Sequence, residues 1–423
     1  MRNPGIPPMM LAMSQSQVIV IGGGGTGAAM AYDLALRGLG VTLLERGELT
    51  SGTTGRHHGQ LHCGARYAVQ DREIGGECME ESTILRRIAS DSIEFNYGLF
   101  VALTGEDELY ADTFIPACEA CGIPTRLLTA GQALAMEPRL SPKLRLAVQV
   151  PDGSMDAWRL ALQFFASARA QGADIRNFSE VVGLQSTDST AAGTKSRITG
   201  VRVRDYRSGW EYELEADLVI NASGAWSRRV VGMAGIDIPV SPSPGTMVAV
   251  KGRLANMVIS RLHPPGDGDI IVPQRNLSII GSTQWLAEDP DDISVPDGDV
   301  ENLLQSAAEM VPAFRDAPLH AAWAAPRPLV GEAEGDVGLR SLSRDFSLMD
   351  HRETDGVERF LSIIGGKATT LRGMAEITAD RACEKLGIRS PCRTAEEPLL
   401  PARNFYKTPS PDFPGRDFPV GEK

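Results

Sequence analysis

The 423-residue sequence is poor in cysteine and aromatic residues, has no excess of positive charge and contains no long apolar run. Its 42 basic and 54 acidic residues give a net charge of −12, which excludes a broad nucleic-acid-binding face. The six cysteines are sparse and irregularly spaced, as in a reducing compartment, so neither a disulfide framework nor a metal site is expected. Because no run of about 18 apolar residues occurs, we predict a cytoplasmic protein without a membrane span. Peripheral contact with the inner membrane stays open.

The overall composition is that of a folded globular protein, with 42% hydrophobic and 23% charged residues. Its first predicted unit is a β-α-β motif. Residues 18–21 (VIVI) read as a buried strand, residues 22–27 (GGGGTG) as a turn, and residues 28–38 as a helix that ends at Gly38. A second apolar strand at 41–44 ends at Glu45. This order of elements predicts a dinucleotide-binding unit.

The glycines of this turn match the pattern G-x-G-x-x-G at Gly22, Gly24 and Gly27. In such a motif they allow a tight turn, a close approach of the pyrophosphate and close packing of helix on strand. The helix N-terminus then presents free N–H groups to the phosphates. Glu45 lies 18 residues beyond Gly27, where an acid binds the adenosine ribose hydroxyls, which disfavours NADP.

Beyond this unit the sequence predicts two domains. The polar residues 46–69 read as a ligand-binding loop, helices are expected at 77–95 and 158–170 (the second capped by Asp156), and a β-hairpin is expected at 198–214. Short strands separated by Gly, Pro and Asp between 241 and 340 indicate an antiparallel sheet. We assign 16–95, 150–240 and 341–395 to a nucleotide-binding domain, 96–149 and 241–340 to a substrate domain, and 396–423 to an extended Pro-rich tail.

Several stretches resemble the FAD-dependent glycerol-3-phosphate dehydrogenases, and among them the flavoprotein component of the anaerobic enzyme, within the larger group built like D-amino-acid oxidase. The stretches are VIVIGGGGTGAAMAYDLALRG with LLERG, SGTTGRHHGQLHCGARYAV, VPDGSMDAWRL, VINASGAW, RPLVG and IIGGKATTLRGMAE, and they extend from about residue 17 to about residue 400. The resemblance implies an α/β fold, with a Rossmann-like FAD-binding domain and an antiparallel-sheet substrate domain. It also implies non-covalently bound FAD, and oxidation of the secondary alcohol of a small polyol phosphate to a ketone by hydride transfer to flavin N5.

The resemblance further implies which residues contact the flavin, because in this family the loop matching 51–62 lies along it. Together with the glycine motif, the expected cofactor-binding residues are Gly22, Gly24, Gly25, Thr26, Gly27, Glu45, Arg46, Ser51, Thr53, Thr54, Gly59, Gln60, Leu61, Val182, Ser223, Gly224, Trp226, Gly366, Lys367, Ala368 and Thr369.

For the substrate, the resemblance implies contacts from Arg66, Tyr67, Arg327, Arg344 and Thr370. A phosphate ester carries up to two negative charges, and arginine presents a planar fork of donors that suits it. An acidic chain needs a local cluster of this kind to hold a small anionic substrate at all.

Two side chains are predicted to act in catalysis. Lys367 follows a Gly-Gly turn and would place a positive charge at the flavin pyrimidine edge, where reduction builds negative charge. The alcohol proton needs a base, for which His62 is the first candidate and His58 the second. His57, His58 and Cys63 are also the residues to which a flavin could be attached.

In one respect the sequence departs from the family, whose members continue into a Cys-rich extension for an iron–sulfur centre. Here the chain stops at Lys423, so we expect electrons to leave through a partner subunit, an acceptor protein or oxygen. Two other functions stay open. One is an FAD-dependent amino-acid or amine oxidase of the same fold, and the other is an FAD-carrying subunit of a larger dehydrogenase that serves in assembly or electron relay.

Overall fold

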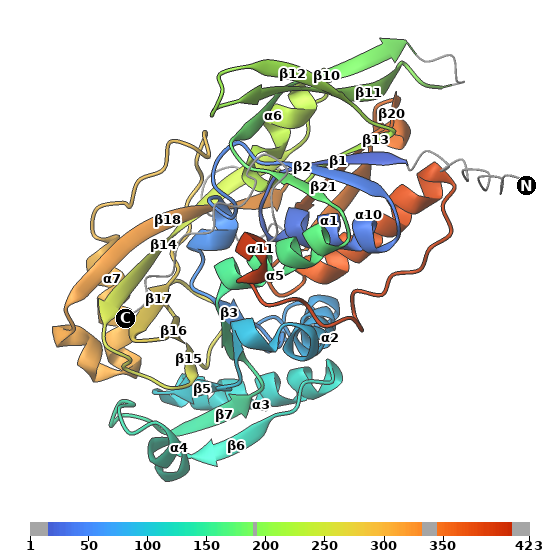
Figure 1. Ribbon diagram of the computed structural model, residues 1–423. Helices are drawn as coiled ribbons and strands as arrows, with labels where there is room; N and C mark the ends of the chain where they lie inside the picture. Colours follow the sequence, from blue (N-terminus) through green and yellow to red (C-terminus); the bar gives the residue numbers. More distant parts are fainter. Residues whose placement is uncertain (1–15, 189–192, 332–344, 408–423) are drawn as a thin grey trace, which may run out of the picture.

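The computed structural model describes residues 16–188, 193–331 and 345–407 (Figure 1). Its centre is a six-stranded sheet in the order β19-β21-β13-β1-β2-β9. Strand β1 pairs in parallel with both β2 and β13, while β19 is antiparallel to β21. The strands are β1 (Gln17–Ile21), β2 (Gly40–Leu44), β9 (Asp174–Arg176), β13 (Leu218–Asn221), β19 (Phe346–Asp350) and β21 (Phe360–Gly365).

Both faces of this sheet are covered, which explains why β1 is apolar at successive positions. Val18 and Val20 pack in one cluster with helices α1 (Gly25–Leu36), α5 (Ala157–Ala170) and α10 (Leu371–Leu386). Ile19 and Ile21 point the other way, into a cluster with β10 (Ser179–Asp188) and β11 (Ser196–Asp205). A strand alternates its side chains between the two faces, so burial on both sides requires the continuous run VIVI.

The second large sheet has eight strands in the order β18-β14-β17-β16-β15-β5-β7-β6. It is antiparallel except where β15 pairs with β5. Helix α7 (Asp299–Met310) packs in a core cluster on one face, and α3 (Gly105–Ala120) in a cluster on the other. Its strands are β5 (Gly98–Ala102), β6 (Arg126–Thr129), β7 (Leu146–Val150), β14 (Val240–Lys251), β15 (Val258–Arg261), β16 (Ile270–Gln274), β17 (Leu277–Gly281) and β18 (Leu319–Val330).

This sheet joins strands from 96–149 with strands from 241–340, the two segments that we assign to the substrate domain. The domain boundaries themselves stay a prediction. Helix α2 (Arg72–Ile88) has 17 residues. The remaining elements are short: strands β3 (Gln60–Leu61), β4 (Ile93–Glu94), β8 (Gly153–Met155), β12 (Glu211–Glu215) and β20 (Val357–Glu358), helices α4 (Ala130–Met136), α6 (Ser227–Gly232), α9 (His351–Thr354) and α11 (Asn404–Lys407), and 3-10 turns η1 (Thr53–Arg56), η2 (Ser90–Ser92), η3 (Gly224–Trp226) and η4 (Pro312–Asp316).

Several predicted elements are confirmed and two are corrected. The Asp156 carboxylate accepts from Arg159 N at the start of α5, and β11 and β12 form the predicted hairpin. The helix expected at 77–95 is wrong at both ends, because the Asp71 carboxylate caps it by accepting from Ile74 N and the chain leaves it after Ile88. The tail is not wholly extended, since α11 forms in it.

The tail packs onto the nucleotide-binding region as far as it is described. Leu399 N donates to Ile88 O at 2.8 Å and Leu400 N to Ser167 Oγ at 3.0 Å. The Arg169 guanidinium lies 3.8 Å from the centre of the Phe405 ring. Residues 408–423 of the predicted tail lie outside the described residues. No helix in the described ranges is long and apolar enough to cross a membrane.

Candidate functional site

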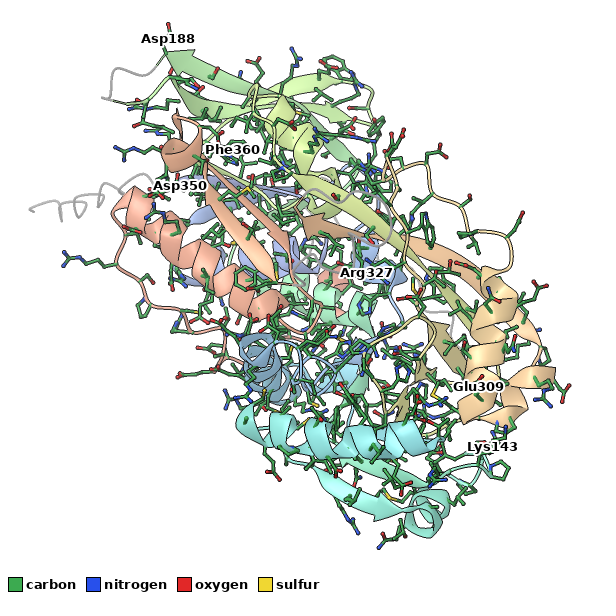
Figure 2. All side chains as sticks on the ribbon, turned by 180° about the vertical axis from the view of Figure 1, so that it is seen from behind. Lys143, Asp188, Glu309, Arg327, Asp350 and Phe360 are labelled. Atoms are coloured by element: carbon green, nitrogen blue, oxygen red, sulfur yellow. The ribbon has the colours of Figure 1, made fainter. Side chains whose placement is uncertain are left out.

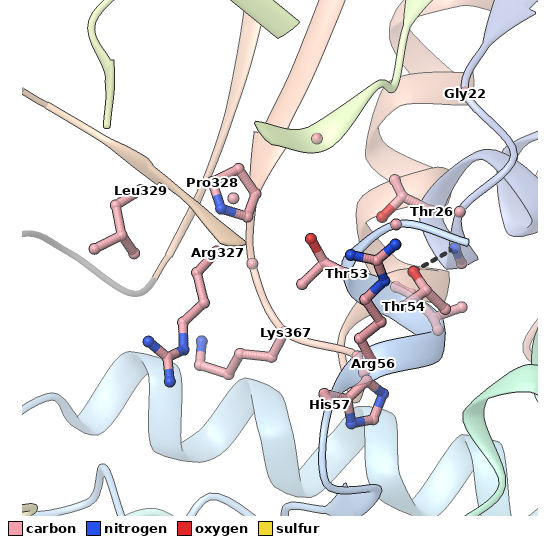
Figure 3. A pocket seen from close by; sticks show the side chains of 18 of the residues that line it. Gly22, Thr26, Thr53, Thr54, Arg56, His57, Arg327, Pro328, Leu329 and Lys367 are labelled. Carbon is pink, nitrogen blue, oxygen red and sulfur yellow. Dashed lines mark hydrogen bonds between the residues drawn. The ribbon is translucent and has the colours of Figure 1, made fainter. Parts of the chain in front are cut away.

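The turn between β1 and α1 requires glycine at two positions because protein backbone packs closely against it. Gly22 has a φ of +113°, and a Cβ there would lie 2.6 Å from Ala222 O. A Cβ on Gly27 would lie 2.0 Å from Gly22 O, so the helix can approach the turn only with glycine at this position. The Gly25 N–H donates to Thr54 Oγ1 at 2.9 Å, which ties the loop 51–62 to the start of the helix (Figure 3).

Glu45 lies at the end of β2 and closes this turn from the other side. Its carboxylate accepts from Gly23 N at 2.7 Å and from Gly47 N at 2.8 Å. The acid predicted to bind a ribose is therefore held in place by two backbone donors.

The turn opens into a cavity of about 860 Å³ that runs between the two large sheets. Twenty of the predicted site residues line it: Gly22, Gly24, Gly25, Thr26, Glu45, Arg46, Ser51, Thr53, Thr54, Gln60, His62, Arg66, Tyr67, Ser223, Gly224, Trp226, Arg327, Gly366, Lys367 and Ala368.

Six predicted residues do not face this cavity, and their contacts show why. Thr369 and Thr370 are fully buried, and their hydroxyls accept from the backbone N–H of His62 and of Lys367. Leu61 is buried in the core, and Gly27 and Gly59 meet protein atoms on the side where a Cβ would stand. The cavity is lined by Glu180 and Val181, which precede Val182, and Arg344 lies outside the described residues. Thr370 thus supports Lys367, and its expected contact with the substrate stays a prediction.

Three cationic side chains from distant segments meet at one end of the cavity. Arg66 donates to Asp269 Oδ2 at 2.8 Å and to Gly266 O at 3.0 Å, which fixes its guanidinium. Arg327 extends from β18 near the middle of the molecule and donates to the Ser282 hydroxyl and, at 3.2 Å, to Thr283 O (Figure 2). Figure 3 shows Arg327 and Lys367 extending toward the same part of the cavity.

Lys367 also lies near an aromatic ring at this end of the cavity, since its Nζ is 5.1 Å from the centre of the Tyr67 ring. The His62 ring is 5.5 Å from the same ring. Burial and then the charges of Arg66 and Lys367 lower the pKa of His62 to about 3, so its imidazole is neutral at neutral pH.

The neighbouring histidines are held as one tautomer. The Nδ1 of His57 accepts from Gly59 N at 2.9 Å, and that of His58 from Gln60 N at 3.1 Å. Burial lowers the pKa of His57 to about 4 and also lowers the pKa of His58, so both rings are neutral and carry their proton on Nε2. His57 Nε2 is buried at the cavity without a hydrogen-bond partner in the described part of the chain. A buried donor of this kind suits a ligand that brings an acceptor.

These observations fit a flavin dinucleotide. The cavity has room for one, its walls combine a glycine turn at a helix N-terminus with a buried unpaired donor, and it ends among cations. Cys63 is fully buried in another cluster and is not among the residues that line the cavity. Attachment of a flavin to Cys63 would therefore require the core to open.

Sequence reasoning missed part of the cavity wall. The missed residues come from the loop after β17 (Ser282, Thr283, Gln284, Pro290 and Asp291), from α6 (Arg229 and Val230) and from the segment before β16 (Pro265, Gly266 and Asp267). No local pattern marks them, because they reach the site only through tertiary structure: the eight-stranded sheet positions the two loops, and α6 follows β13 of the six-stranded sheet.

The fold and this site define a flavin-dependent oxidoreductase. A model of the FAD dependent oxidoreductase family matches residues 17–381, and the chain belongs to this family. The predicted fold class, cofactor and type of enzyme are thereby confirmed.

Among curated relatives, the chain is 41% identical over 398 residues to the A1 component of the anaerobic glycerol-3-phosphate dehydrogenase of Haloferax volcanii, covering 92% of this chain and 67% of that one. It is 40% identical over 383 residues to the corresponding component of the Escherichia coli K12 enzyme, covering 90% and 69%. Among solved structures, the glycine oxidase of Geobacillus kaustophilus has a TM-score of 0.68 at 25% identity, covering 91% of this chain and 99% of that one. The FAD complex of glycerol-3-phosphate dehydrogenase from Bacillus halodurans also has a TM-score of 0.68, at 24% identity, covering 94% and 71%, and supports the fold.

Proposed function

We propose that the protein oxidises the secondary alcohol of sn-glycerol 3-phosphate, or of a similar small polyol phosphate, to the ketone. The observation that carries this proposal is the convergence of Arg66, Arg327 and Lys367 at one end of a cavity that fits FAD. Relatives with 40% and 41% identity are named as subunits of glycerol-3-phosphate dehydrogenases, which supports the same substrate class.

The charge of the site favours a phosphate over a carboxylate. The protein as a whole carries −12, so an anionic substrate is attracted only by local cations. A phosphate dianion can accept hydrogen bonds from two guanidinium groups and an ammonium group at once, whereas an amino acid brings one carboxylate and a positive charge of its own. The site therefore suits the dehydrogenase better than the amino-acid oxidase that the fold also permits.

His62 is the proposed base. At neutral pH its ring is uncharged and can accept the proton of the substrate hydroxyl. Burial is the main cause of the low pKa of His62, and the charges of Arg66 and Lys367 add to it. A phosphate bound beside Arg66 and Lys367 would offset these two charges. Substrate binding thus raises the basicity of His62 when a base is needed.

Lys367, which Thr370 supports, is the second side chain that we propose to act in catalysis. Bound FAD supplies the hydride acceptor, its N5 atom. Thr370 hydrogen-bonds to both the N–H and the C=O of Lys367, each at 3.3 Å, and thereby fixes the turn that carries the ammonium group. We propose that Lys367 holds positive charge beside the acceptor ring and beside the substrate phosphate.

The electrons must then leave the protein. The relatives are named as one lettered component of a larger enzyme, and this supports transfer to a partner protein. We propose such a partner as the physiological acceptor, with oxygen as a slow substitute.

The test is an anaerobic bleaching experiment on the purified flavoprotein. sn-Glycerol 3-phosphate should abolish the flavin absorbance and yield dihydroxyacetone phosphate, whereas glycerol and glycine should leave the spectrum unchanged. Bleaching by glycine or another amino acid, with none by any polyol phosphate, would reverse the choice of substrate class.

A further inference from the structure

A loop between β17 and α7, residues 282–298, runs along the cavity and is here named the strap. Its first residues, 282–284, lie at the substrate end, where the Ser282 hydroxyl and Thr283 O accept from Arg327. Pro290 and Asp291 line the same cavity farther along the strap. One loop therefore borders both the proposed substrate end and the part of the cavity near the nucleotide turn.

At that second position Asp291 joins three side chains of the nucleotide-binding region. Its carboxylate accepts from Arg46 at 2.5 and 3.2 Å, from Arg229 at 2.5 Å and from the Trp226 indole N–H at 2.9 Å. Arg46 directly follows Glu45, and its guanidinium lies 4.7 Å from the centre of the Trp226 ring. Arg229 also donates to Asp289. We name these residues the Asp291 clamp.

The strap is attached unevenly. Before residue 288 it is tied to β14 by backbone hydrogen bonds, from Trp285 N to Pro244 O at 3.2 Å and from Ala287 N to Pro242 O at 3.0 Å. Residues 288–295 are instead held to other described segments by ion pairs and hydrogen bonds of the Asp289 and Asp291 carboxylates. Two carboxylates therefore supply the ion pairs that join this half of the strap to the nucleotide-binding region.

The ion pairs of the clamp are individually weak enough for the clamp to open. The side chains of Arg46, Arg229 and Asp291 are 39%, 43% and 43% exposed, so each ion pair alone is weak in water. The arginines and the Trp226 N–H together hold the pKa of Asp291 well below its usual range. Three side chains that share one carboxylate give a contact that is firm when closed and can be broken by a single charge change.

We propose that the strap closes the FAD site and that the Asp291 clamp sets the rate at which the cofactor enters and leaves. A dinucleotide that lies under residues 290–291 cannot pass them while Asp291 bridges Arg46, Trp226 and Arg229. The clamp touches the cofactor end rather than the substrate cations, so its role does not depend on the identity of the substrate.

The test measures flavin release from the holoprotein, by the rise in FAD fluorescence after dilution. Asp291→Asn keeps the shape of the side chain and removes its charge, and should release FAD about tenfold faster than the wild type. Asp237→Asn is the matched control, because Asp237 also forms an exposed ion pair, with Arg228, but does not line the cavity. The control should release FAD at the wild-type rate.

Salt supplies a second measurement that needs no variant. Raising the salt concentration from about 0.05 M to about 0.5 M screens exposed ion pairs and should speed release from the wild type and from Asp237→Asn. Release from Asp291→Asn should respond much less. Equal release rates for the wild type and Asp291→Asn, or wild-type release that does not respond to salt, would overturn the proposal. Neither readout requires turnover, so failure here is distinct from failure of the proposed dehydrogenase activity.

Discussion

The two ends of the cavity are built by different means. The turn at the nucleotide end is made by a continuous stretch, β1 to β2, whose glycines shape the backbone. The substrate end is made by Arg66, Arg327 and Lys367, which lie in three distant segments and meet because the sheets bring them together. At the first end shape is decisive, and at the second end charge is decisive.

Because of this difference, substitutions at the two ends of the cavity should have different effects. A Cβ added at Gly22 or Gly27 collides with backbone, which cannot move without disturbing β13 or α1. A charge changed at the substrate end leaves the backbone in place, so the flavin should stay bound while the substrate is lost. The following changes test that separation.

The largest effect is expected from Gly27→Ala. The new Cβ would stand 2.0 Å from Gly22 O, and the strain should destabilise the protein by about 3 kcal/mol and abolish flavin binding. Gly131→Ala is the control, because this helical glycine has no atom within 4 Å of the new Cβ. Thermal unfolding and the flavin-to-protein absorbance ratio measure both variants. Flavin retained at the wild-type ratio in Gly27→Ala would refute the shape argument.

The next effect concerns the proposed base. His62→Gln should lower the rate of anaerobic flavin reduction by about 10²- to 10⁴-fold, because no neutral imidazole then accepts the alcohol proton. The flavin content should remain that of the wild type, since the backbone bond from His62 N to Thr369 is unaffected. A stopped-flow trace of flavin absorbance gives the rate. An unchanged rate would exclude His62 as the base and direct attention to His58.

A smaller effect is expected when the arginine fork is lost but its charge is kept. Arg327→Lys should raise the Kd of the phosphate substrate by about 10- to 100-fold with little change in flavin binding. Arg145→Lys serves as the control, because Arg145 forms an exposed ion pair with Glu108 away from the cavity. Substrate titrations that show equal affinity in both variants would remove Arg327 from the substrate site.

The smallest effect is a pH dependence of the apoprotein. The folded-state pKa of His57 is about 4 and the ordinary value is 6.5, so between these values the unfolded chain binds a proton that the folded chain does not. His57 should therefore make stability fall as the pH decreases through this window, by at most about 1.4 kcal/mol per pH unit, and should contribute no slope above it. His58 and His62, whose pKa values burial also lowers, add slopes of their own. Urea unfolding at pH 7 and pH 5 measures the slope. His57→Gln should make the slope shallower by the share of one histidine, because His58 and His62 keep their own shares. An identical slope in the variant would contradict the assignment.

The nucleotide end could be predicted from the sequence because its information is local. The run VIVI, the glycine spacing and Glu45 specify strand, turn and acid within 30 residues. The resemblance to a family added the substrate cations, of which Arg66, Arg327 and Lys367 face the cavity. The roles of these residues stay predictions until the variants are measured.

What could not be predicted depends on contacts across the chain. The sequence predicts only short strands separated by Gly, Pro and Asp between 241 and 340, yet β14 and β18 have 12 residues each, with Pro242 opposite Pro328 and Pro244 opposite Pro326. Prolines are tolerated there because β18 is an edge strand and β14 pairs with β17 only from Met247 onward. The contacts of the strap could likewise not be predicted from the sequence, since Asp291 meets Arg46 and Arg229 only in the folded arrangement of both sheets.

The most direct test of the central claim compares phosphorylated and unphosphorylated substrates in one protein. The second-order rate of anaerobic flavin bleaching should be at least about 10³-fold higher with sn-glycerol 3-phosphate than with glycerol, because two or more charge-assisted contacts hold the phosphate. The ratio should shrink in Arg327→Lys while the flavin remains bound. Equal rates with the two substrates, or no bleaching by the phosphate while an amino acid reduces the flavin, would contradict the account.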